Sequence, residues 1–230
     1  MKSFLRGQIV NILSYLSRKN LAKYNPIIIA VTGNIGKTTT KDYINSFLKY
    51  RYNNSDVEIV RASKKSENSE FGVNLTILGE KNQWNNIWGW IKLIVRNFMI
   101  LPKTVTFPKI LVLEVGADKP GDIRYITTII KPDIVVLTAF QESPTHGEFF
   151  LNIDQHINEK KVLVEKMKKD GIIVYNSDDA IITTIAYERR ERNLKLKLFS
   201  FGMNADSNVI ILENSNLYSD DAEIMGTKIR

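Results

Sequence analysis

The chain has 230 residues, of which 43% are hydrophobic and 25% charged, and it carries a formal net charge of +7. Length and composition are typical of a globular protein with one or two domains, and the absence of cysteine excludes disulfide bonds and thiolate metal sites. A positive charge suits nucleic acid, acidic lipid or a phosphorylated substrate. Because Lys and Arg are scattered in a sequence rich in Lys, Ile and Asn, we attribute the charge to compositional bias and expect no nucleic-acid partner.

Residues 3–22 are predicted to form a basic amphipathic helix. Apolar side chains recur at helical spacing, at Phe4, Leu5, Ile9, Ile12, Leu13 and Leu16. The helix either lies on a membrane or partner, or packs against its own chain, and we favour packing because apolar helix faces are usually buried internally. Residues 1–24 lack the features of a secretory signal, and no apolar stretch is long enough to span a bilayer, so we expect a cytoplasmic protein.

Residues 27–40, IIIAVTGNIGKTTT, predict a buried strand that passes through a glycine-containing loop into a helix. Backbone N–H groups at the start of that helix would converge with a lysine ammonium, which suits a bound phosphate. The loop departs from the G-x-x-x-x-G-K-[ST] pattern, because Val31 stands where the first glycine is expected and the earlier glycine is Gly33. An ordinary strand, turn and helix with incidental glycines is the alternative.

The glycines, the lysine and the first threonine of this short loop each have an expected role. Gly33 and Gly36 would let the backbone approach phosphate oxygens, Lys37 would reach the β and γ phosphates, and Thr38 would place its hydroxyl on Mg²⁺. Residues 37–50 continue as a helix and residues 57–62 form a second strand. The following segment, SENSEFGVNLTILG, is a polar turn that opens an apolar helix, where Asn68 and Glu70 either cap the helix or face the active site. Capping is the favoured interpretation.

Residues 84–101, WNNIWGWIKLIVRNFMIL, contain all three tryptophans and a dense apolar run, with Lys92 and Arg96 one turn apart. Such a helix is too short to span a bilayer but suits its interface, with Trp rings at headgroup depth and the cations on the wet face. The alternative is a helix that covers one face of the sheet. The two interpretations stand equal. Residues 102–108 form a proline-rich connection.

Residues 110–115 predict a buried strand that carries Glu114 near its end. A buried carboxylate is costly unless it is compensated, by Mg²⁺ in a P-loop protein or, less specifically, by helix N–H groups. Residues 123–130 predict a helix and residues 134–138 the next strand. His146 follows that strand, in the loop AFQESPTHGEFF. Because ligands of open α/β sheets bind beyond the carboxyl ends of the strands, we predict a metal-ligand role for His146 rather than a solvated loop position.

The rest of the chain alternates in the same way. A charged helix is predicted at residues 154–169, strands at 172–175 and 196–201, and the start of a hairpin at 208–213 and 222–229. The four residues after the first of these strands, Asn-Ser-Asp-Asp at 176–179, can cap the next helix.

Together these segments resemble the central, ATP-binding domain of the Mur ligases, the cytoplasmic enzymes that build the peptidoglycan precursor. TGNIGKTTT resembles the family's phosphate loop, LVLEVGADKPGDIRYITTIIKPDIVVLT its magnesium-glutamate strand with the following helix and strand, SPTHGEFF its His-bearing loop, and YNSDD its element near the adenine. The resemblance covers residues 26–230. It implies an α/β fold, a P-loop-containing three-layer domain with a mostly parallel central sheet, here preceded by an amphipathic helix at residues 1–25.

The resemblance also implies roles for individual residues. ATP is expected at Thr32, Gly33, Asn34, Ile35, Gly36, Lys37, Thr38, Thr39, Asn176 and Asp179. Mg²⁺ is expected on Thr38 and Glu114, with a second ion on His146. Lys160 lies fourteen residues after His146 and resembles the lysine that family members often carry as a carbamate. The implied catalytic set is Lys37, Glu114, His146 and Lys160.

SENSEFGVNLTIL resembles the Asn-Asn-Glu-x-Gly-Val-Pro-Leu segment of the Mur ligases that join a D-alanyl-D-alanine dipeptide to a UDP-muramoyl peptide. This implies that Asn68, Ser69 and Glu70 face the substrate, although Ser69 replaces an Asn and Asn74 the Pro of that pattern. The implied activity is an ATP-dependent amide ligation through an acyl phosphate.

Three departures from the family pattern temper this expectation. Fewer than thirty residues precede the P-loop, the family's C-terminal domain is absent, and the Trp-rich insertion at 84–108 has no counterpart. We therefore expect a fragment or a reduced form. One alternative is a nucleotide-binding module without ligase activity, held on the inner membrane face by residues 1–22 and 84–101. Another is a related ligase that acts on a different carboxylate, such as a folate or a polypeptide.

Overall fold

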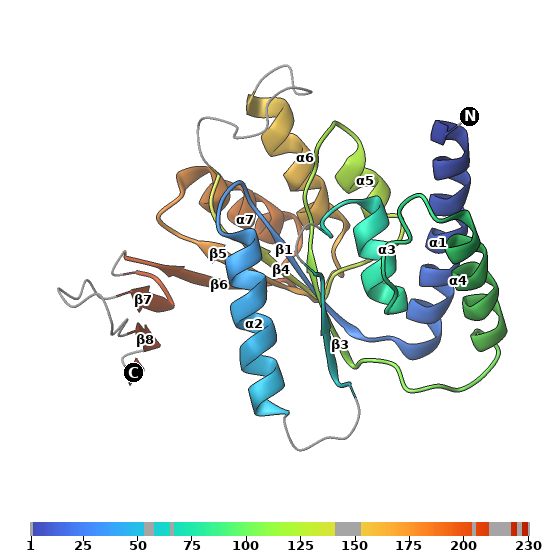
Figure 1. Cartoon of the computed structure of the whole chain (residues 1–230). Coiled ribbons are helices and arrows are strands. Elements are labelled where there is room, and N and C mark those ends of the chain that lie inside the picture. Colours follow the sequence, from blue (N-terminus) through green and yellow to red (C-terminus); the bar gives the residue numbers. More distant parts are fainter. Residues whose placement is uncertain are drawn as a thin grey trace.

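The computed structural model describes residues 2–52, 58–64, 67–140, 153–203, 206–211, 222–224 and 227–229. A twisted sheet crosses the centre of this described part, with strands in the order β2-β3-β1-β4-β5-β6-β7-β8-β9 (Figure 1). Neighbouring strands from β2 to β7 are parallel, whereas β8 pairs antiparallel with both β7 and β9. The predicted α/β class with a mostly parallel sheet is confirmed.

The strand bounds are β1 Ile27–Thr32, β2 Val60–Ala62, β3 Ile110–Glu114, β4 Ile134–Leu137, β5 Ile172–Asn176, β6 Lys197–Gly202, β7 Val209–Ile211, β8 Ala222–Ile224 and β9 Thr227–Ile229. The helix bounds are α1 Lys2–Tyr24, α2 Lys37–Arg51, α3 Glu70–Leu78, α4 Ile87–Ile100, α5 Asp122–Ile126, α6 Ile153–Lys166 and α7 Ala180–Arg192. The segment predicted as one strand at 222–229 is therefore two short antiparallel strands.

Two hydrophobic clusters hold the helices on opposite faces of the sheet. Alternate residues of β1 point to opposite faces, so Ile28 joins the cluster that contains α3, α5, α6 and α7, and Ile29 joins the cluster under α2. Figure 1 shows α2 alone on its side of the sheet. Burial on both faces explains why the central strands are almost purely apolar, and it confirms three layers.

The helix predicted at residues 123–130 is shorter than expected, because α5 ends at Ile126. The hydroxyl of Thr127 donates to the Arg124 carbonyl at 2.8 Å, and that of Thr128 donates to the Tyr125 carbonyl at 2.7 Å. Such local side-chain bonds compete with the helical ladder and favour turns. Periodicity alone could not show where the helix stops.

Helices α1 and α4 form a further layer outside α3. Leu13 of α1, Leu75 of α3 and Trp90 of α4 belong to one buried cluster, and Figure 1 shows α4 outermost beside α1. Packing of the N-terminal helix against its own chain is thus confirmed. The interpretation of the Trp-rich helix as a cover for the sheet is wrong, since its buried residues contact α1 and α3 instead. No helix in the described residues is long and apolar enough to cross a bilayer.

Candidate nucleotide-binding site

The loop between β1 and α2 lies tightly against the end of β4. The Asn34 N–H donates to the Ala139 carbonyl at 2.7 Å. A Cβ atom added at Gly33 would lie 2.0 Å from Oγ1 of Thr138, and Gly36 has a φ of +81° as the N-cap of α2. Glycine is required at the first position by close approach and at the second by backbone conformation. The two glycines therefore fix the path of the loop from β1 into α2.

Lys37 and Thr38 start α2 beside the buried carboxylate of Glu114. Val31 of β1 pairs in register with Glu114 of β3, so the strand ends bring the P-loop and the carboxylate together. Oγ1 of Thr38 donates to Oε2 of Glu114 at 2.9 Å, and Nζ of Lys37 donates to the Asn34 carbonyl at 3.1 Å. Burial lowers the pKa of Lys37, and the negative charge of Glu114 opposes that shift.

These residues fit a magnesium nucleotide by their chemistry. The Thr38 hydroxyl and the Glu114 carboxylate are hard oxygen ligands of the kind that Mg²⁺ prefers. The buried hydroxyl of Thr32 has no hydrogen-bond partner among the described residues, so it has capacity for a ligand. The described residues contain no group of three His, Asp or Glu side chains placed to hold a metal ion by themselves.

Lys160 of α6 lies on the far side of the same site. Its side chain is 2% exposed, and its ammonium lies 5.6 Å from the centre of the Phe140 ring. Burial lowers the pKa of Lys160 to about 7, the positive charge of Lys37 adds to that shift, and Glu159 opposes it. A lysine with its pKa lowered in this way is neutral more often near pH 7 than an ordinary lysine, and the neutral amine is the nucleophilic form needed for carbamate formation.

The position of Lys160 depends on its neighbour Glu159. The Glu159 carboxylate accepts the N–H groups of Gly121, Ile123 and Arg124, so it caps the start of α5. This fixes the turn of α6 that carries Lys160. Sequence reasoning missed Glu159, because no local pattern marks a carboxylate that caps a helix 36 residues earlier.

Asp179, the N-cap residue of α7, has a structural role that the sequence predicted. Its carboxylate accepts the N–H groups of Ile181 and Ile182 and so caps α7, which confirms the cap expected at residues 176–179. It also accepts the N–H of Phe140 at 2.7 Å, a contact that the sequence did not predict. The expected contact of Asn176 and Asp179 with adenine stays a prediction.

The capping role expected for Asn68 or Glu70 is not seen. Ser69 is the N-cap of α3, and its side chain makes no capping hydrogen bond. Glu70 instead lies 3.8 Å from the Arg6 guanidinium of α1, and the Asn68 carbonyl accepts the Gly116 N–H. Ser69 and Glu70 line a pocket of about 740 Å³ together with residues of α1 and α5. The expected contact of Asn68, Ser69 and Glu70 with the substrate stays a prediction.

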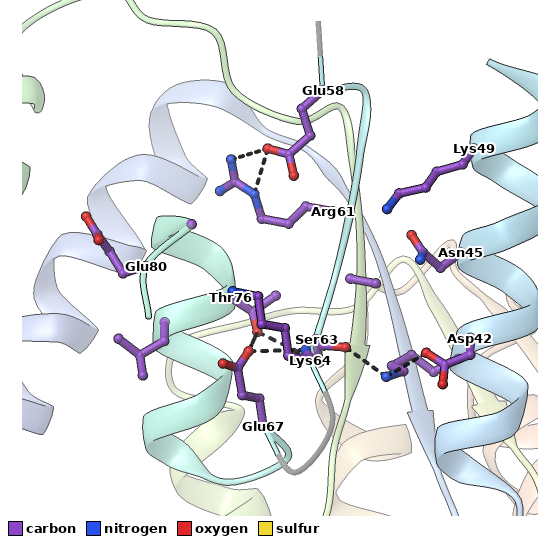
Figure 2. Close-up of a pocket in the computed structure, with 14 residues that line it drawn as sticks. Asp42, Asn45, Lys49, Glu58, Arg61, Ser63, Lys64, Glu67, Thr76 and Glu80 are labelled. Carbon is purple, nitrogen blue, oxygen red and sulfur yellow. Dashed lines mark hydrogen bonds and ion pairs between the residues drawn. The ribbon is translucent and has the colours of Figure 1, made fainter. Parts of the chain in front are cut away.

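A second pocket, of about 520 Å³, lies at the edge of the sheet between α2, β2 and α3. Figure 2 shows Arg61 and Glu58 turned toward each other in this pocket, with their closest atoms 2.5 Å apart. The buried ammonium of Lys41 donates to the Ser63 carbonyl at 2.8 Å and also pairs with Asp42. Oγ of Ser63 accepts the Glu114 N–H at 3.2 Å. Lys41 and Ser63 therefore anchor α2 and β3 to each other beside the phosphate loop.

His146 lies outside the described residues, so its role as a ligand for a second metal stays a prediction. The other expected catalytic residues, Lys37, Glu114 and Lys160, lie at one end of the parallel strands.

The family model and the similar proteins found by comparison agree on one family. Residues 96–229 match the Mur ligase middle domain. The chain is 27% identical over 171 residues to a UDP-N-acetylmuramoyl-tripeptide–D-alanyl-D-alanine ligase of Bacillus subtilis, which covers 74% of this chain and 30% of that protein. The corresponding enzyme of Haemophilus influenzae is 25% identical, with 68% of this chain and 28% of that protein covered. The chain thus spans about a third of the length of these relatives.

Solved structures show the same fold. The MurF ligase of Thermotoga maritima in complex with ADP superposes with a TM-score of 0.69 at 23% identity, covering 96% of this chain and 43% of the other. A complex of FPGS with AMPPCP gives a TM-score of 0.58 at 16% identity over 96% of this chain and 55% of the other. At these identities the likeness extends to the fold alone.

Proposed function

This chain belongs to the Mur ligase family, and from that membership we propose that it binds ATP with Mg²⁺ and forms part of an ATP-dependent amide ligase. The proposed substrates are those named for its curated relatives, a UDP-muramoyl tripeptide and D-alanyl-D-alanine. A carboxylate of the first would be activated as an acyl phosphate and then attacked by the amine of the second. This chain spans about a third of the length of those relatives and would supply the nucleotide-binding part of the ligase.

The observation that carries the proposal is the contact between Thr38 and Glu114. A hydroxyl at the first turn of a helix and a carboxylate at the end of the neighbouring strand lie 2.9 Å apart, beside a lysine ammonium. Each group alone is common, but their convergence at the carboxyl ends of parallel strands is the arrangement that phosphoryl transfer requires. When bound, magnesium supplies charge stabilisation to the transferring phosphoryl group.

Each residue of the nucleotide site has a separate proposed role. Thr38 and Glu114 would hold the metal, and the backbone N–H groups at the start of α2 would surround the phosphates. Lys37 would neutralise charge that develops on the γ phosphate. Lys160 faces the same site and would, as its carbamate, turn a buried cation into an anionic metal ligand. His146 would hold the second ion.

Asn68, Ser69 and Glu70 are proposed to contact the substrate. Ser69 and Glu70 line the pocket next to α5, where Arg6 of α1 adds a positive charge. Lys119, Asp118 and Asp122 line the same space. The pocket therefore offers both a cation and carboxylates to a peptide substrate.

Isothermal titration with ATP and Mg²⁺ tests the nucleotide site. We expect Lys37→Ala to weaken ATP binding by at least about a hundredfold, because it removes a buried charge-assisted contact worth roughly 3 kcal/mol. Lys49→Ala, an exposed lysine near the end of the same helix, is the matched control and should bind ATP as the unmodified chain does. Equal binding by both variants would show that the loop is not the phosphate site.

Phosphate release tests the ligase. Purified protein with ATP and Mg²⁺ should release phosphate when UDP-muramoyl tripeptide and D-alanyl-D-alanine are both present, and not when either is omitted. Release with a folate or a polypeptide and glutamate would instead identify the ligase that acts on another carboxylate. Binding of ATP without release under any of these conditions, in a longer reading frame as well as in this chain, would contradict the ligase assignment.

A nucleotide-binding module on a membrane surface is the second candidate. It is favoured by one observation, the exposed apolar side chains of α4 and of the turn before it, where Trp88 and Trp84 are 70% and 80% exposed. Such a surface is compatible with a ligase as well, so a peripheral position on the inner membrane face and ligase activity are tested separately.

A further inference from the structure

Helix α4 and the turn before it carry a row of exposed apolar side chains on the side opposite the buried Trp90 and Leu93; Trp84 and Ile87 at one end also border a pocket shared with α1 and α3. We call this row the α4 outer face; its exposed residues are Trp84, Ile87, Trp88, Ile91, Val95, Phe98 and Met99. Within the helix these positions follow three- and four-residue spacing, so their side chains lie along one side. Figure 1 shows no helix or strand beyond α4 on this side. Contiguous apolar surface of this kind marks an interaction site.

The α4 outer face is not needed to hold α4 in place. The opposite side of the helix packs Trp90 and Leu93 against α1 and α3. Asn97 donates to Glu80 at 2.7 Å, Arg96 also pairs with Glu80, and Asn86 caps the first turn. The helix is therefore fixed from behind and presents the α4 outer face as a preformed surface.

The segments that form α1 and α4 carry positive charge without acidic residues, a pattern that the net charge of the whole chain does not reveal. Residues 1–24 and 81–109 together contain ten Lys or Arg and no Asp or Glu, whereas the rest of the chain contains 22 basic and 25 acidic residues. The cations are scattered along the sequence, as expected, but the acids are missing from the two segments that form α1 and α4 with their flanks. The whole net positive charge of the chain thus belongs to this outer layer.

The cations border the apolar surface rather than interrupt it. Lys92 is exposed and Arg96 lies one turn further along the same edge of α4. On α1, Tyr15 stacks on Phe98 with ring centres 6.2 Å apart, and Lys19 lies 5.5 Å from the Tyr15 ring. Lys23 bonds the Leu101 carbonyl at the end of α4. Apolar centre and cationic border therefore belong to one surface built from two helices.

We propose that the α4 outer face docks into the interface of a bilayer that contains anionic lipid. Aliphatic and Trp side chains would lie among the headgroups and upper acyl chains, and the bordering Lys and Arg would contact lipid phosphates. Helix α1 contributes cations and Tyr15, but its apolar side is buried against α3, so it does not insert. This differs from an amphipathic N-terminal anchor, because the inserted helix is α4.

Charge and apolar content favour lipid over the other occupants of such a surface. A symmetric dimer through this face would bring the ten cations of one copy against those of the other, which is repulsive. Nucleic acid would pair with the cations but would leave the aliphatic side chains without an apolar partner. An anionic bilayer satisfies both the charge and the apolar surface. Since α2 and the apolar α4 face lie on opposite sides of the sheet, docking leaves the P-loop helix facing away (Figure 1).

Vesicle flotation and tryptophan fluorescence test the proposal with the whole chain. The protein should float with vesicles of phosphatidylcholine and phosphatidylglycerol, with a blue shift of its emission and quenching by brominated acyl chains, and much less with phosphatidylcholine alone. The double variant Trp88→Ser/Val95→Ser should bind at least about tenfold more weakly, because two exposed apolar groups no longer insert. Lys19→Gln/Lys92→Gln should weaken binding at low salt and reduce its salt dependence.

The control variant is Tyr43→Ser/Phe47→Ser, which removes equally exposed aromatic side chains from α2 on the other face of the sheet. It should bind vesicles within about twofold of the unmodified chain. All variants change exposed side chains, so thermal unfolding should match and should confirm that each is folded. The proposal is overturned if the folded chain stays soluble with anionic vesicles, or if the α4 variant floats as well as the control. Loss of a dimer or of oligonucleotide binding in the α4 variant, without any vesicle binding, would assign the surface to those partners instead.

Discussion

Gly33 shows how closely a single residue controls the phosphate loop. A methyl group at this position would collide with the Thr138 hydroxyl, 2.0 Å from the added carbon. Gly33→Ala should therefore displace the loop, lower the free energy of unfolding by about 1–3 kcal/mol and weaken ATP binding at least about tenfold. Urea unfolding and titration calorimetry measure the two effects.

Gly121 is the matched control for that substitution. It also has a positive φ, +95°, but nothing lies within 4 Å of an added carbon. Gly121→Ala should lower the free energy of unfolding by only about 1–2 kcal/mol, the cost of placing a residue with a Cβ atom in a left-handed backbone conformation. It should leave ATP affinity unchanged. If both variants lose ATP binding equally, steric contact with Thr138 is not what fixes the loop.

Lys160 makes stability depend on pH in a defined direction. Burial lowers its pKa from 10.5 to about 7, whereas in the unfolded chain the ordinary value applies. Between these values the unfolded state binds more protons than the folded state, so the free energy of unfolding rises with pH, by up to about 1.4 kcal/mol per pH unit. Well below pH 7 the lysine is protonated in both states, so the free energy of unfolding no longer changes with pH through Lys160.

Urea denaturation at pH 7, 8 and 9 tests the effect. The advantage of Lys160→Met over the unmodified chain should shrink as pH rises, because the variant has no amine to deprotonate. Lys166→Met, an exposed lysine on α6, should follow the unmodified chain at every pH. Parallel curves for Lys160→Met and the unmodified chain would show that the amine titrates normally.

Single residues also show what sequence alone could not supply. Lys37, Thr38 and Glu114 were predicted because each occupies a fixed place relative to a strand end. Phe140, Ser63 and Glu159 were not, because their contacts join segments that are distant in the chain and carry no local pattern.

At the level of elements, Asn74 couples α3 to α1. It replaces the proline of the family pattern, is fully buried, and donates to Oγ of Ser14 at 2.9 Å and to the Glu70 carbonyl at 2.8 Å. A proline has no group that could make this link. The departure that weakened the resemblance in the sequence thus has a structural reason in this chain, where an N-terminal helix packs on α3.

A double-mutant cycle tests this coupling. Ser14→Ala and Asn74→Leu should each lower the free energy of unfolding by about 1–3 kcal/mol, since each leaves a buried polar partner with one bond fewer. The double variant should be more stable than the sum predicts by about 1 kcal/mol, because the bond between Ser14 and Asn74 is lost only once. Ser46→Ala on the exposed side of α2 is the control. Additive losses would mean that Ser14 and Asn74 do not interact.

Helices and strands were predicted well where the hydrophobic periodicity was strong. They were predicted poorly where tertiary contacts determine where an element ends or which side of it is buried. The six strands up to β6 were expected within a few residues, because runs such as ILVLE can only be buried in a covered sheet. The end of α5 and the split of the last strand depended on hydroxyl bonds and on cross-strand pairing. The position of α4 outside α1 could not be predicted, because its apolar residues surround much of the helix and only packing shows which side is buried.

For the whole molecule, the packing indicates two units of different stability. The sheet with α2, α3, α5, α6 and α7 holds the main cluster and the cluster under α2, whereas α1 and α4 share a small cluster with α3 and reach the main cluster through Leu21 of α1. Elements with fewer buried contacts open at lower free energy than the core. Amide hydrogen exchange should therefore be faster in α1 and α4 than in β1, β3 and β4.

Two leucines that are both fully buried separate the units. Leu13 lies in the small cluster and Leu163 in the main one. Truncation of either to alanine should remove about 2–5 kcal/mol of packing. Leu13→Ala should accelerate exchange throughout α1 and α4 while β4 and β5 stay protected, whereas Leu163→Ala should accelerate exchange everywhere by lowering global stability. If Leu13→Ala speeds exchange of the sheet as much as Leu163→Ala does, the outer layer unfolds together with the nucleotide-binding domain, and α4 cannot be altered at a membrane surface without consequence for the site.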